Sequence, residues 1–350
     1  MLESGSFAMR RSAESARVLL GCGKVSAAKS RRRTLFCREL SAFLVWAIGF
    51  SGAAFAETYM LSRDRLGEIR LNDPEVWEDG VVPSGSGYVI VTHTNWISGV
   101  GYQNVTVKDA ASFDILKNAG EISISYGTRF AVHCDDDMDL SASVKGSGTF
   151  VKDGKGELRL LSHKITGTIY YDLETSYCVT NGTLRLPVSD DAKAYTHSYN
   201  NFYIAEGATL VPVQNGTTQC DSLNGAGAIT GRKESGTPDE FIMYGRNSTN
   251  MFHGTISGLI SIRATAAYTL LSNANSTYSG VTDIRGYSDY KGFLETPFIG
   301  MVNQPSPFGT NKVIALNTGG GMLRYIGEGE TTDKTFNLLE SPSIIDAGPH

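Results

Sequence analysis

The chain has 350 residues, of which 41% are hydrophobic and 19% charged, which is enough apolar content to bury a core and argues against disorder over most of the chain. Glycine is frequent, with 39 residues, but it has no three-residue period and is accompanied by only 10 prolines, so a collagen triple helix is excluded. The net charge is uneven, because the first 56 residues hold nine of the 31 Lys and Arg residues and three of the 36 Asp and Glu residues. The remainder has a net charge of −11, which argues against nucleic acid as a partner.

The first 56 residues have the pattern of a secretory signal peptide with an extended basic leader. Arg31 to Arg33 form a basic start, residues 43–50 form an apolar centre, and the small residues Ala54 and Ala56 stand just before Glu57. The apolar run is shorter than the ~20 residues that span a bilayer, so we expect cleavage before Glu57 rather than a membrane anchor. No later segment is long and apolar enough to span a membrane, so we expect a secreted or cell-surface protein.

The mature chain alternates apolar and polar residues with a period of two, which is typical of short half-buried strands. Glycine, asparagine, aspartate or serine separates the strands, and no helix pattern is convincing. We therefore expect short strands every eight to nine residues, the first of which contain the apolar pairs Val105 and Val107, Phe113 and Ile115, Ile122 and Ile124, and Phe130 and Val132.

One short sequence phrase, which we call the repeat phrase, recurs several times. In "GELRLLS" the alternation places Leu158 and Leu160 on one face, and "GTLRLPV" does the same with Leu184. Looser copies follow at residues 206–213, 223–231 and 252–263. Self-similarity at intervals of tens of residues indicates a solenoid. The alternative is a β-sandwich, in which Asn181-Gly182 and Asn215-Gly216 would form hairpin turns.

The repeated phrase resembles the autotransporter-associated β-strand repeat. The resemblance implies a right-handed parallel β-helix, and the bacterial proteins that carry this repeat imply export to the cell surface. Corners of such a coil need glycine where the backbone takes positive φ, and inward apolar residues stack from rung to rung. The matching residues are Gly146, Gly148, Lys152, Gly154, Gly156, Leu158, Leu160, Gly182, Leu184, Gly254, Gly258, Asn275, Tyr278 and Gly280.

The strongest candidate for chemistry is "HCDDDMD". In a strand, Asp135, Asp137 and Asp139 would project to one side and could offer oxygen ligands to calcium, the one cofactor that we consider; the alternative is a solvated acidic corner. Three cysteines remain after the leader, which allows at most one disulfide, and none has the spacing of a zinc or redox site. They are Cys134, Cys178 and Cys220.

A polysaccharide-degrading enzyme on a β-helix, either a lyase or a glycosidase, is the rival function. Paired carboxylates would be its signature, although neighbours in a strand point to opposite faces. An aromatic sugar-stacking surface is a further hypothesis. The adjacent acids are Asp136, Asp137, Asp190, Asp191, Asp239 and Glu240. The aromatic residues are Tyr195, Tyr199, Phe202 and Tyr203. The histidines have no recognisable nucleophile partner; they are His93, His133, His163, His197 and His253.

The sequence favours an exported β-helical repeat protein that acts as a structural or adhesive surface element over an enzyme. We assign no catalytic residue. We expect a carbohydrate or cell-surface ligand as partner, together with an outer-membrane translocator outside this chain. The expected organisation is a leader at 1–56, an amino-terminal cap with the first strands at 57–100, and a repeat region at 101–350 that continues beyond His350.

Overall fold

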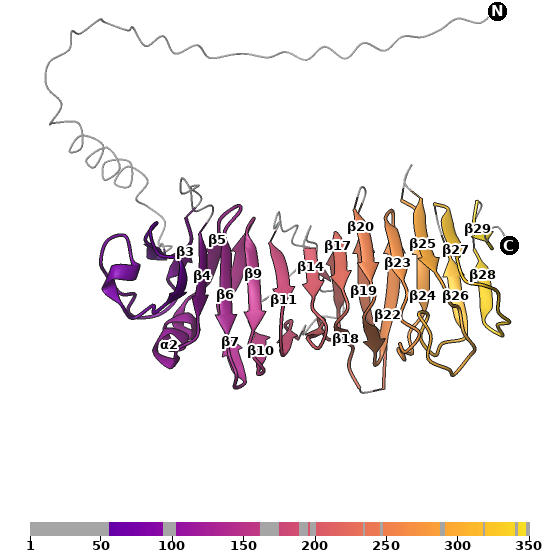
Figure 1. Cartoon of the computed structure of the whole chain (residues 1–350), viewed down its shortest axis with the longest axis horizontal. Helices are drawn as coiled ribbons and strands as arrows, with labels where there is room; N and C mark the ends of the chain where they lie inside the picture. The colour runs from indigo at the N-terminus through magenta and orange to yellow at the C-terminus, as the bar shows by residue number, and fades with distance from the viewer. Residues whose placement is uncertain are drawn as a thin grey trace, which may run out of the picture. The chain divides into compact units, whose positions relative to one another are not determined.

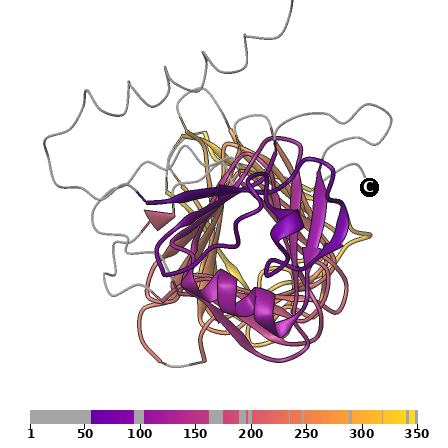
Figure 2. The same cartoon turned by 90° about the vertical axis from the view of Figure 1, so that its left-hand side faces the viewer.

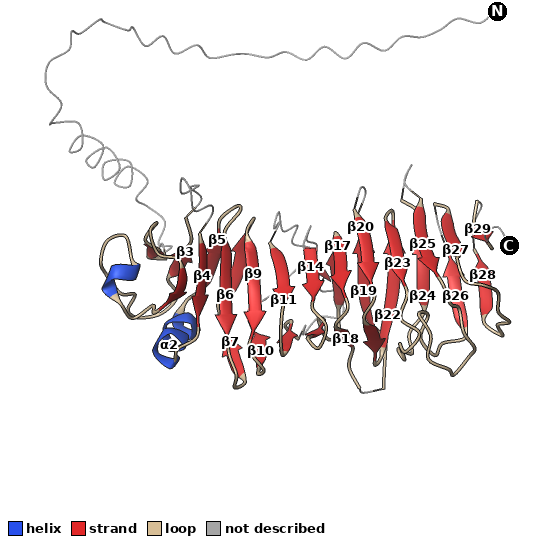
Figure 3. Cartoon of the chain, in the orientation of Figure 1, coloured by secondary structure: helices blue, strands red, loops and turns tan. Residues whose placement is uncertain are grey.

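The computed structural model describes residues 56–93, 103–161, 175–188, 195–196, 201–233, 235–245, 248–287, 291–317, 319–339 and 342–347. These residues belong to one compact unit, Phe55–His350, in which nearly every element is a strand (Figure 3). Most of the predicted signal peptide, Ala54 included, lies outside the described residues, whereas Ala56 and Glu57 are exposed.

Four parallel sheets build this unit. The long sheet has twelve strands: β2 (Gly67–Ile69), β4 (Asn104–Val107), β6 (Arg129–His133), β9 (Thr149–Asp153), β11 (Ser176–Val179), β14 (Asn201–Ile204), β17 (Ser222–Gly225), β20 (Thr249–Phe252), β23 (Tyr268–Leu271), β25 (Gly292–Thr296), β27 (Gly321–Tyr325) and β29 (Ile344–Asp346).

Three shorter sheets complete the rungs. The N-terminal sheet contains β1 (Thr58–Met60), β3 (Val89–Val91), β5 (Glu121–Ile124) and β8 (Ser143–Gly146). The middle sheet contains β7 (Met138–Leu140), β10 (Glu157–Leu160), β12 (Thr183–Arg185), β15 (Thr209–Val211), β18 (Ala228–Thr230) and β21 (Thr255–Ser257). The C-terminal sheet contains β13 (Tyr195–Thr196), β16 (Thr217–Cys220), β19 (Asp239–Tyr244), β22 (Ile260–Thr265), β24 (Thr282–Arg285), β26 (Val313–Leu316) and β28 (Thr335–Leu338).

The chain coils through these sheets in turn. It leaves the long sheet at β9, enters the middle sheet at β10 and returns to the long sheet at β11, beside β9. Successive rungs therefore stand side by side (Figure 1), and the strands surround a common axis when the stack is viewed from its end (Figure 2). The predicted parallel β-helix is confirmed.

The β-sandwich alternative is wrong. Every pairing between the described strands is parallel, whereas hairpins would pair neighbouring strands antiparallel. Asn181-Gly182 joins β11 of the long sheet to β12 of the middle sheet, so it is a corner between sheets rather than a hairpin turn. Asn215, which has a φ of 58°, lies in the same way between β15 and β16.

The core consists of ladders of identical or similar side chains. In the long sheet Phe130, Phe150, Tyr177 and Phe202 occupy one register position and are all buried. The rings of Tyr177 and Phe202 stack with their centroids 5.4 Å apart. In the middle sheet Leu158 and Leu184 pair directly and are fully buried, as their alternation with arginine predicts. Each ladder buries apolar area against the rung on either side, which stabilises the stack.

One predicted strand is a helix. Phe113 and Ile115 lie in α2 (Ala110–Asn118), where the period-two interpretation is wrong. The side chain of Asp109 caps this helix by accepting the backbone N–H of Ser112 at 3.0 Å. The residues that α2 buries are Ser112 and Leu116, which are four apart and therefore share one helical face. The Ser112 hydroxyl also accepts the backbone N–H of Leu71 at 2.7 Å, which ties the helix to the first rungs.

Candidate functional site

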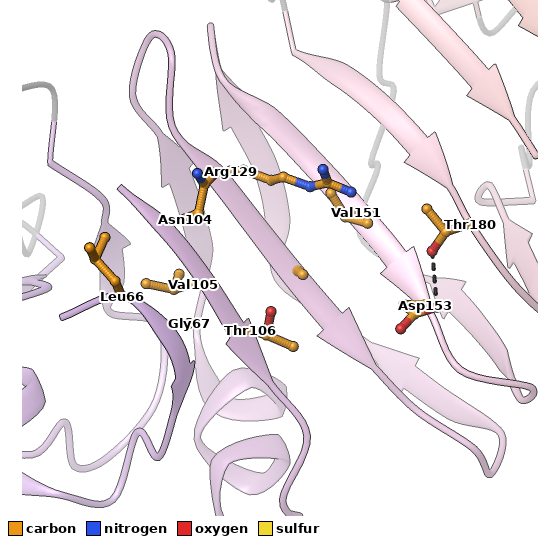
Figure 4. Close-up of a pocket in the computed structure, with 10 residues that line it drawn as sticks. Leu66, Gly67, Asn104, Val105, Thr106, Arg129, Val151, Asp153 and Thr180 are labelled. Atoms are coloured by element: carbon orange, nitrogen blue, oxygen red, sulfur yellow. Dashed lines mark hydrogen bonds between the residues drawn. The ribbon is translucent and has the colours of Figure 1, made fainter. Parts of the chain in front are cut away.

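A groove crosses the outer face of the long sheet near its N-terminal end. Because side chains alternate across a strand, the residues between the core positions of β4, β6, β9 and β11 form a row on the outer face. Strand register makes this row Thr106, Ala131, Val151 and Cys178. Thr106, Ala131 and Val151 form the floor of a hollow with a volume of 630 Å³ (Figure 4), and Cys178 continues the row beyond it.

Polar side chains border the floor on both sides. Asn104 and Arg129 are register neighbours on one side. The opposite side carries Asp153, at the end of β9, and Thr180, just after β11, with the threonine hydroxyl donating to the aspartate at 3.0 Å (Figure 4). The groove runs across the strands, along the stacking direction, because each side takes its residues from successive rungs.

Arg129 is the cation of the groove, and its side chain extends from β6 towards Val151 on β9 (Figure 4). Arg129 is exposed, and its guanidinium makes no hydrogen bond or ion pair with the described residues. Two outward arginines of the middle sheet are paired: Arg159 lies 2.5 Å from Asp139, and Arg185 lies 2.7 Å from Glu157. A guanidinium with no partner among the described residues has N–H donors that a ligand can accept from.

The carboxylate of the groove is held in its charged form. Burial raises the pKa of Asp153, but hydrogen bonds from the ring of His133 at 2.7 Å, the N–H of Gly154 and the hydroxyl of Thr180 outweigh burial, so the pKa lies below its usual value. The groove therefore offers a guanidinium and a carboxylate that are not paired with each other.

An aromatic ring follows the groove floor. Cys178 is the register partner of Tyr203, whose side chain is 50% exposed on the outer face of β14. The predicted aromatic surface is therefore divided: Tyr203 faces outwards, Phe202 is buried in the core, Tyr195 lies on β13, and Tyr199 is outside the described residues.

The three aspartates of the predicted calcium site are exposed at the corner after β6 and on β7, and each contacts the rung that follows. Asp135 and Asp137 accept the backbone N–H groups of Lys155 and Glu157 at 3.1 and 3.0 Å, and Asp139 pairs with Arg159. In the part of the chain described here, no three histidine, cysteine or acidic side chains form a group that could hold a metal ion. Calcium binding stays a prediction.

Lys152 of the repeat phrase has a role that the sequence did not reveal. It occupies an inward register position between Val132 and Val179 and is fully buried. Its ammonium donates to the carbonyl oxygens of Asp153, Gly154 and Asn181 at 2.8, 2.7 and 3.2 Å, so it holds the corners of two rungs together. The signal was present as a lysine at an apolar position of the alternation, two residues before a corner glycine.

The corner glycines of the phrase lie where successive rungs touch. Gly154 has a φ of 80°, and a Cβ added there would lie 2.4 Å from the carbonyl oxygen of Cys134 on the preceding rung. The other glycines that match the repeat are similarly close to other parts of the chain, namely Gly146, Gly148, Gly156, Gly182, Gly254, Gly258 and Gly280.

The later part of the phrase lies between β23 and β24. Tyr278 is fully buried there, and its hydroxyl lies 2.6 Å from that of Thr282 and donates to the carbonyl oxygen of Pro307 at 3.1 Å. Asn275 is exposed, and its backbone N–H bonds the side chain of Asn273 at 2.9 Å.

Those acids of the rival enzyme that lie in the described residues do not gather at one place. Asp239 is buried 3.7 Å from Arg232, and burial, opposed by bonds from Asn215 and the charge of Arg232, raises its pKa. Its neighbour Glu240 forms an ion pair with Arg263. Asp136 is exposed at the acidic corner, while Asp190 and Asp191 lie outside the described residues.

The histidines and cysteines are dispersed. His93 pairs with Glu78 at 2.7 Å, and the His253 ring lies 2.7 Å from the Ser272 hydroxyl. His163 and His197 are outside the described residues. All three cysteines of the described chain are free thiols, with Cys134 and Cys220 buried and Cys178 partly exposed.

The fold and the groove define a parallel β-solenoid with an open ligand-sized surface. The chain is similar to the adhesin BmaC autotransporter of Brucella suis biovar 1 (strain 1330), with 30% identity over 242 residues. This match covers 68% of the chain but only 6% of the adhesin. Together with the solenoid, it fits a passenger-like autotransporter protein and confirms the resemblance predicted from the repeat phrase.

Two other comparisons found no match. No family model matches the chain, and no solved structure matches it. In the described residues, no helix has both the length and the apolar character needed to cross a membrane.

Proposed function

We propose that the chain is part of an exported surface protein with an adhesive or structural role. The observation that carries this proposal is the 242-residue similarity to an autotransporter adhesin, which extends over most of a continuous β-solenoid. A stack of rungs suits this role because each rung rests only on its neighbours, so a long rigid support can be built by repetition. We propose cell-surface or secreted localisation, and export through an outer-membrane translocator.

Adhesion can be tested with beads coated with the purified chain. We expect these beads to attach to cultured epithelial cells or to extracellular-matrix surfaces more than beads coated with the heat-unfolded chain. Circular dichroism before coupling would establish that the solenoid is folded. Equal attachment of the folded and unfolded samples would contradict an adhesive role.

The rival enzymatic function has its own assay. The purified chain is incubated with a panel of acidic and neutral polysaccharides, with and without calcium, and the products are examined for new reducing ends and unsaturated sugars. We expect neither product, because the acids of the rival site that the structure describes lie apart or are paired with arginine. Turnover that disappears in an Asp135→Asn, Asp137→Asn double variant would favour the enzyme.

A further inference from the structure

We propose that the groove over β4, β6 and β9 binds a carboxylate-bearing saccharide, with Arg129 as the residue that recognises the carboxylate. This inference rests on the proposed adhesive function and names the ligand class of its surface. It combines three features of the described residues: an unpaired guanidinium, a polar border on either side of a floor of small side chains, and an exposed aromatic ring in the same outward row beyond that floor.

The charge of the ligand follows from Arg129. A guanidinium presents its donors in a planar fork that matches both oxygens of a carboxylate. Arg159 and Arg185 have acidic partners on the solenoid itself, whereas Arg129 has none within the described chain. Asp153 does not neutralise Arg129, because its carboxylate is engaged with His133 and Thr180. The guanidinium, which has no acidic partner among the described residues, therefore suits an anionic group of a ligand.

The other groups of the groove indicate that the ligand is a saccharide. The backbone groups of β4, β6 and β9 are committed to neighbouring strands, so the floor offers no open strand edge to a peptide backbone. What remains are side-chain groups that hydrogen-bond hydroxyls, namely the amide of Asn104, the hydroxyls of Thr106 and Thr180, and the carboxylate of Asp153. These groups suit a ligand rich in hydroxyls.

The dimensions suit an extended oligosaccharide. The outward row from Thr106 to Tyr203, which begins with the groove floor, crosses four rung spacings, or about 19 Å at ~4.8 Å per spacing. The half-exposed ring of Tyr203 at the far end provides an apolar surface on which a sugar ring can stack.

Binding of defined probes tests the proposal. The purified chain is titrated with fluorescent oligogalacturonate, with a sialylated oligosaccharide, and with the same two probes after reduction of their carboxyl groups to alcohols. We expect at least one carboxylated probe to bind and its reduced form to bind about tenfold or more weakly, because charge-assisted hydrogen bonds are lost. The two probes distinguish a uronate from a sialate ligand. Binding of neither carboxylated probe, or equal affinity for the reduced forms, would overturn the proposal.

Arg129→Gln is the decisive variant, and Arg324→Gln is its matched control. Both arginines lie on the outer face of the long sheet, but Arg324 is placed near Glu295 and Asp346, away from the groove. We expect about a tenfold or larger loss of affinity for Arg129→Gln only. Since the Arg129 side chain is exposed and has no partner among the described residues, we expect its replacement to leave the fold intact. Unchanged binding by Arg129→Gln would overturn the proposal.

The bead assay separates this inference from the proposed function. Val151→Arg places a bulky side chain on the groove floor; its fold is checked by circular dichroism. Wild-type beads that attach to cells are tested again after the cells are treated with protease or after their glycans are oxidised with periodate. If only protease treatment abolishes attachment, the partner is a protein. The saccharide proposal then fails, while the adhesive function stands. If oligosaccharide binding depends on Arg129 and Val151 but the beads never attach, the adhesive function fails and the groove assignment stands.

Discussion

At the scale of single residues, Gly154 allows two reasons for a glycine at a corner to be distinguished: positive φ and close contact with the preceding rung. Gly154 and Gly207 have nearly the same backbone angle, with φ values of 80° and 81°. A Cβ at Gly154 would lie 2.4 Å from a backbone oxygen, whereas a Cβ at Gly207 would meet nothing within 4 Å. The two positions therefore form a matched pair in which only the steric clash differs.

We expect Gly154→Ala to destabilise the fold by more than ~3 kcal/mol, since the rungs must separate, and Gly207→Ala by only ~1 kcal/mol from the positive φ. Urea unfolding of both variants measures the difference. Equal losses would show that backbone conformation, and not rung contact, requires the glycine.

Lys152 gives a second prediction at this scale. In Lys152→Met the carbonyl oxygens of Asp153, Gly154 and Asn181 lose their ammonium donor, so we expect a loss of ~1–3 kcal/mol near neutral pH. Lys155→Met, at the exposed corner of the same phrase, should change stability by no more than ~0.5 kcal/mol. A Lys152→Met variant as stable as the wild type would contradict the structural role of the ammonium.

The same variant reveals the pH dependence of the buried amine. Burial is the main influence on Lys152 and lowers its pKa from 10.5, although Cys134 and Asp153 act in the opposite direction. The unfolded chain therefore binds more protons at this residue than the folded chain, so its contribution to stability becomes more favourable as pH rises from the lowered pKa to about 10.4. Wild type should gain stability relative to Lys152→Met as the pH rises towards about 10.4; a relative loss would mean that the pKa is raised.

At the scale of elements, the in-and-out alternation of β12 predicts effects of different size for adjacent residues. Leu184 is fully buried between Leu158 and Leu210, whereas Arg185 lies on the outer face and pairs with Glu157. We expect Leu184→Ala to cost ~2–5 kcal/mol and Arg185→Gln no more than ~1 kcal/mol.

Hydrogen exchange should show that the damage in Leu184→Ala is local. Each rung contacts only its neighbours, so protection should fall first in β10, β12 and β15 and persist in β24 and β26. A uniform loss of protection across all described strands would indicate one cooperative core and contradict a rung-by-rung solenoid.

The sequence predicted the elements whose local pattern and tertiary environment agree. Leu158 and Leu184 alternate with charged residues, so both the strands and their buried faces could be recognised. In α2 the capping Asp109 and the pair Ser112 and Leu116 were obscured by Phe113 and Ile115, whose spacing of two imitates a strand. Whether a short segment of this kind becomes a helix or a strand is decided by its packing in the completed fold.

The groove could not be predicted because it depends on register. Thr106, Ala131, Val151 and Cys178 are 20 to 27 residues apart and carry no motif, and only parallel pairing of four strands places them in one row. Arg129 was equally inconspicuous, since the sequence does not show which of its arginines lack an acidic neighbour. Of the residues used in the saccharide proposal, only Tyr203 was among the aromatic residues that the sequence predicted to bind a ligand.

At the scale of the whole molecule, export is the property that remains to be measured. If the leader is a signal peptide, amino-terminal sequencing of secreted protein should begin at or within a residue or two of Glu57. The matched control is a variant with Ala54→Leu and Ala56→Leu, which removes the small residues at the predicted cleavage site and should leave the leader attached. Secreted wild-type protein that retains the leader would contradict this interpretation.

The long sheet is the only one of the four whose strands extend from β2 to β29, so it determines how the molecule would respond to pulling forces. The hydrogen bonds between rungs point along the stacking direction, and tension applied in that direction would load them one rung at a time. Successive strands of the long sheet from β6 to β27 are offset by 19 to 29 residues, so each lost rung would release about 65–100 Å of extended chain. A cell held in flowing liquid by such a tether would be slowed by stepwise lengthening, while rungs not yet reached kept their surface intact.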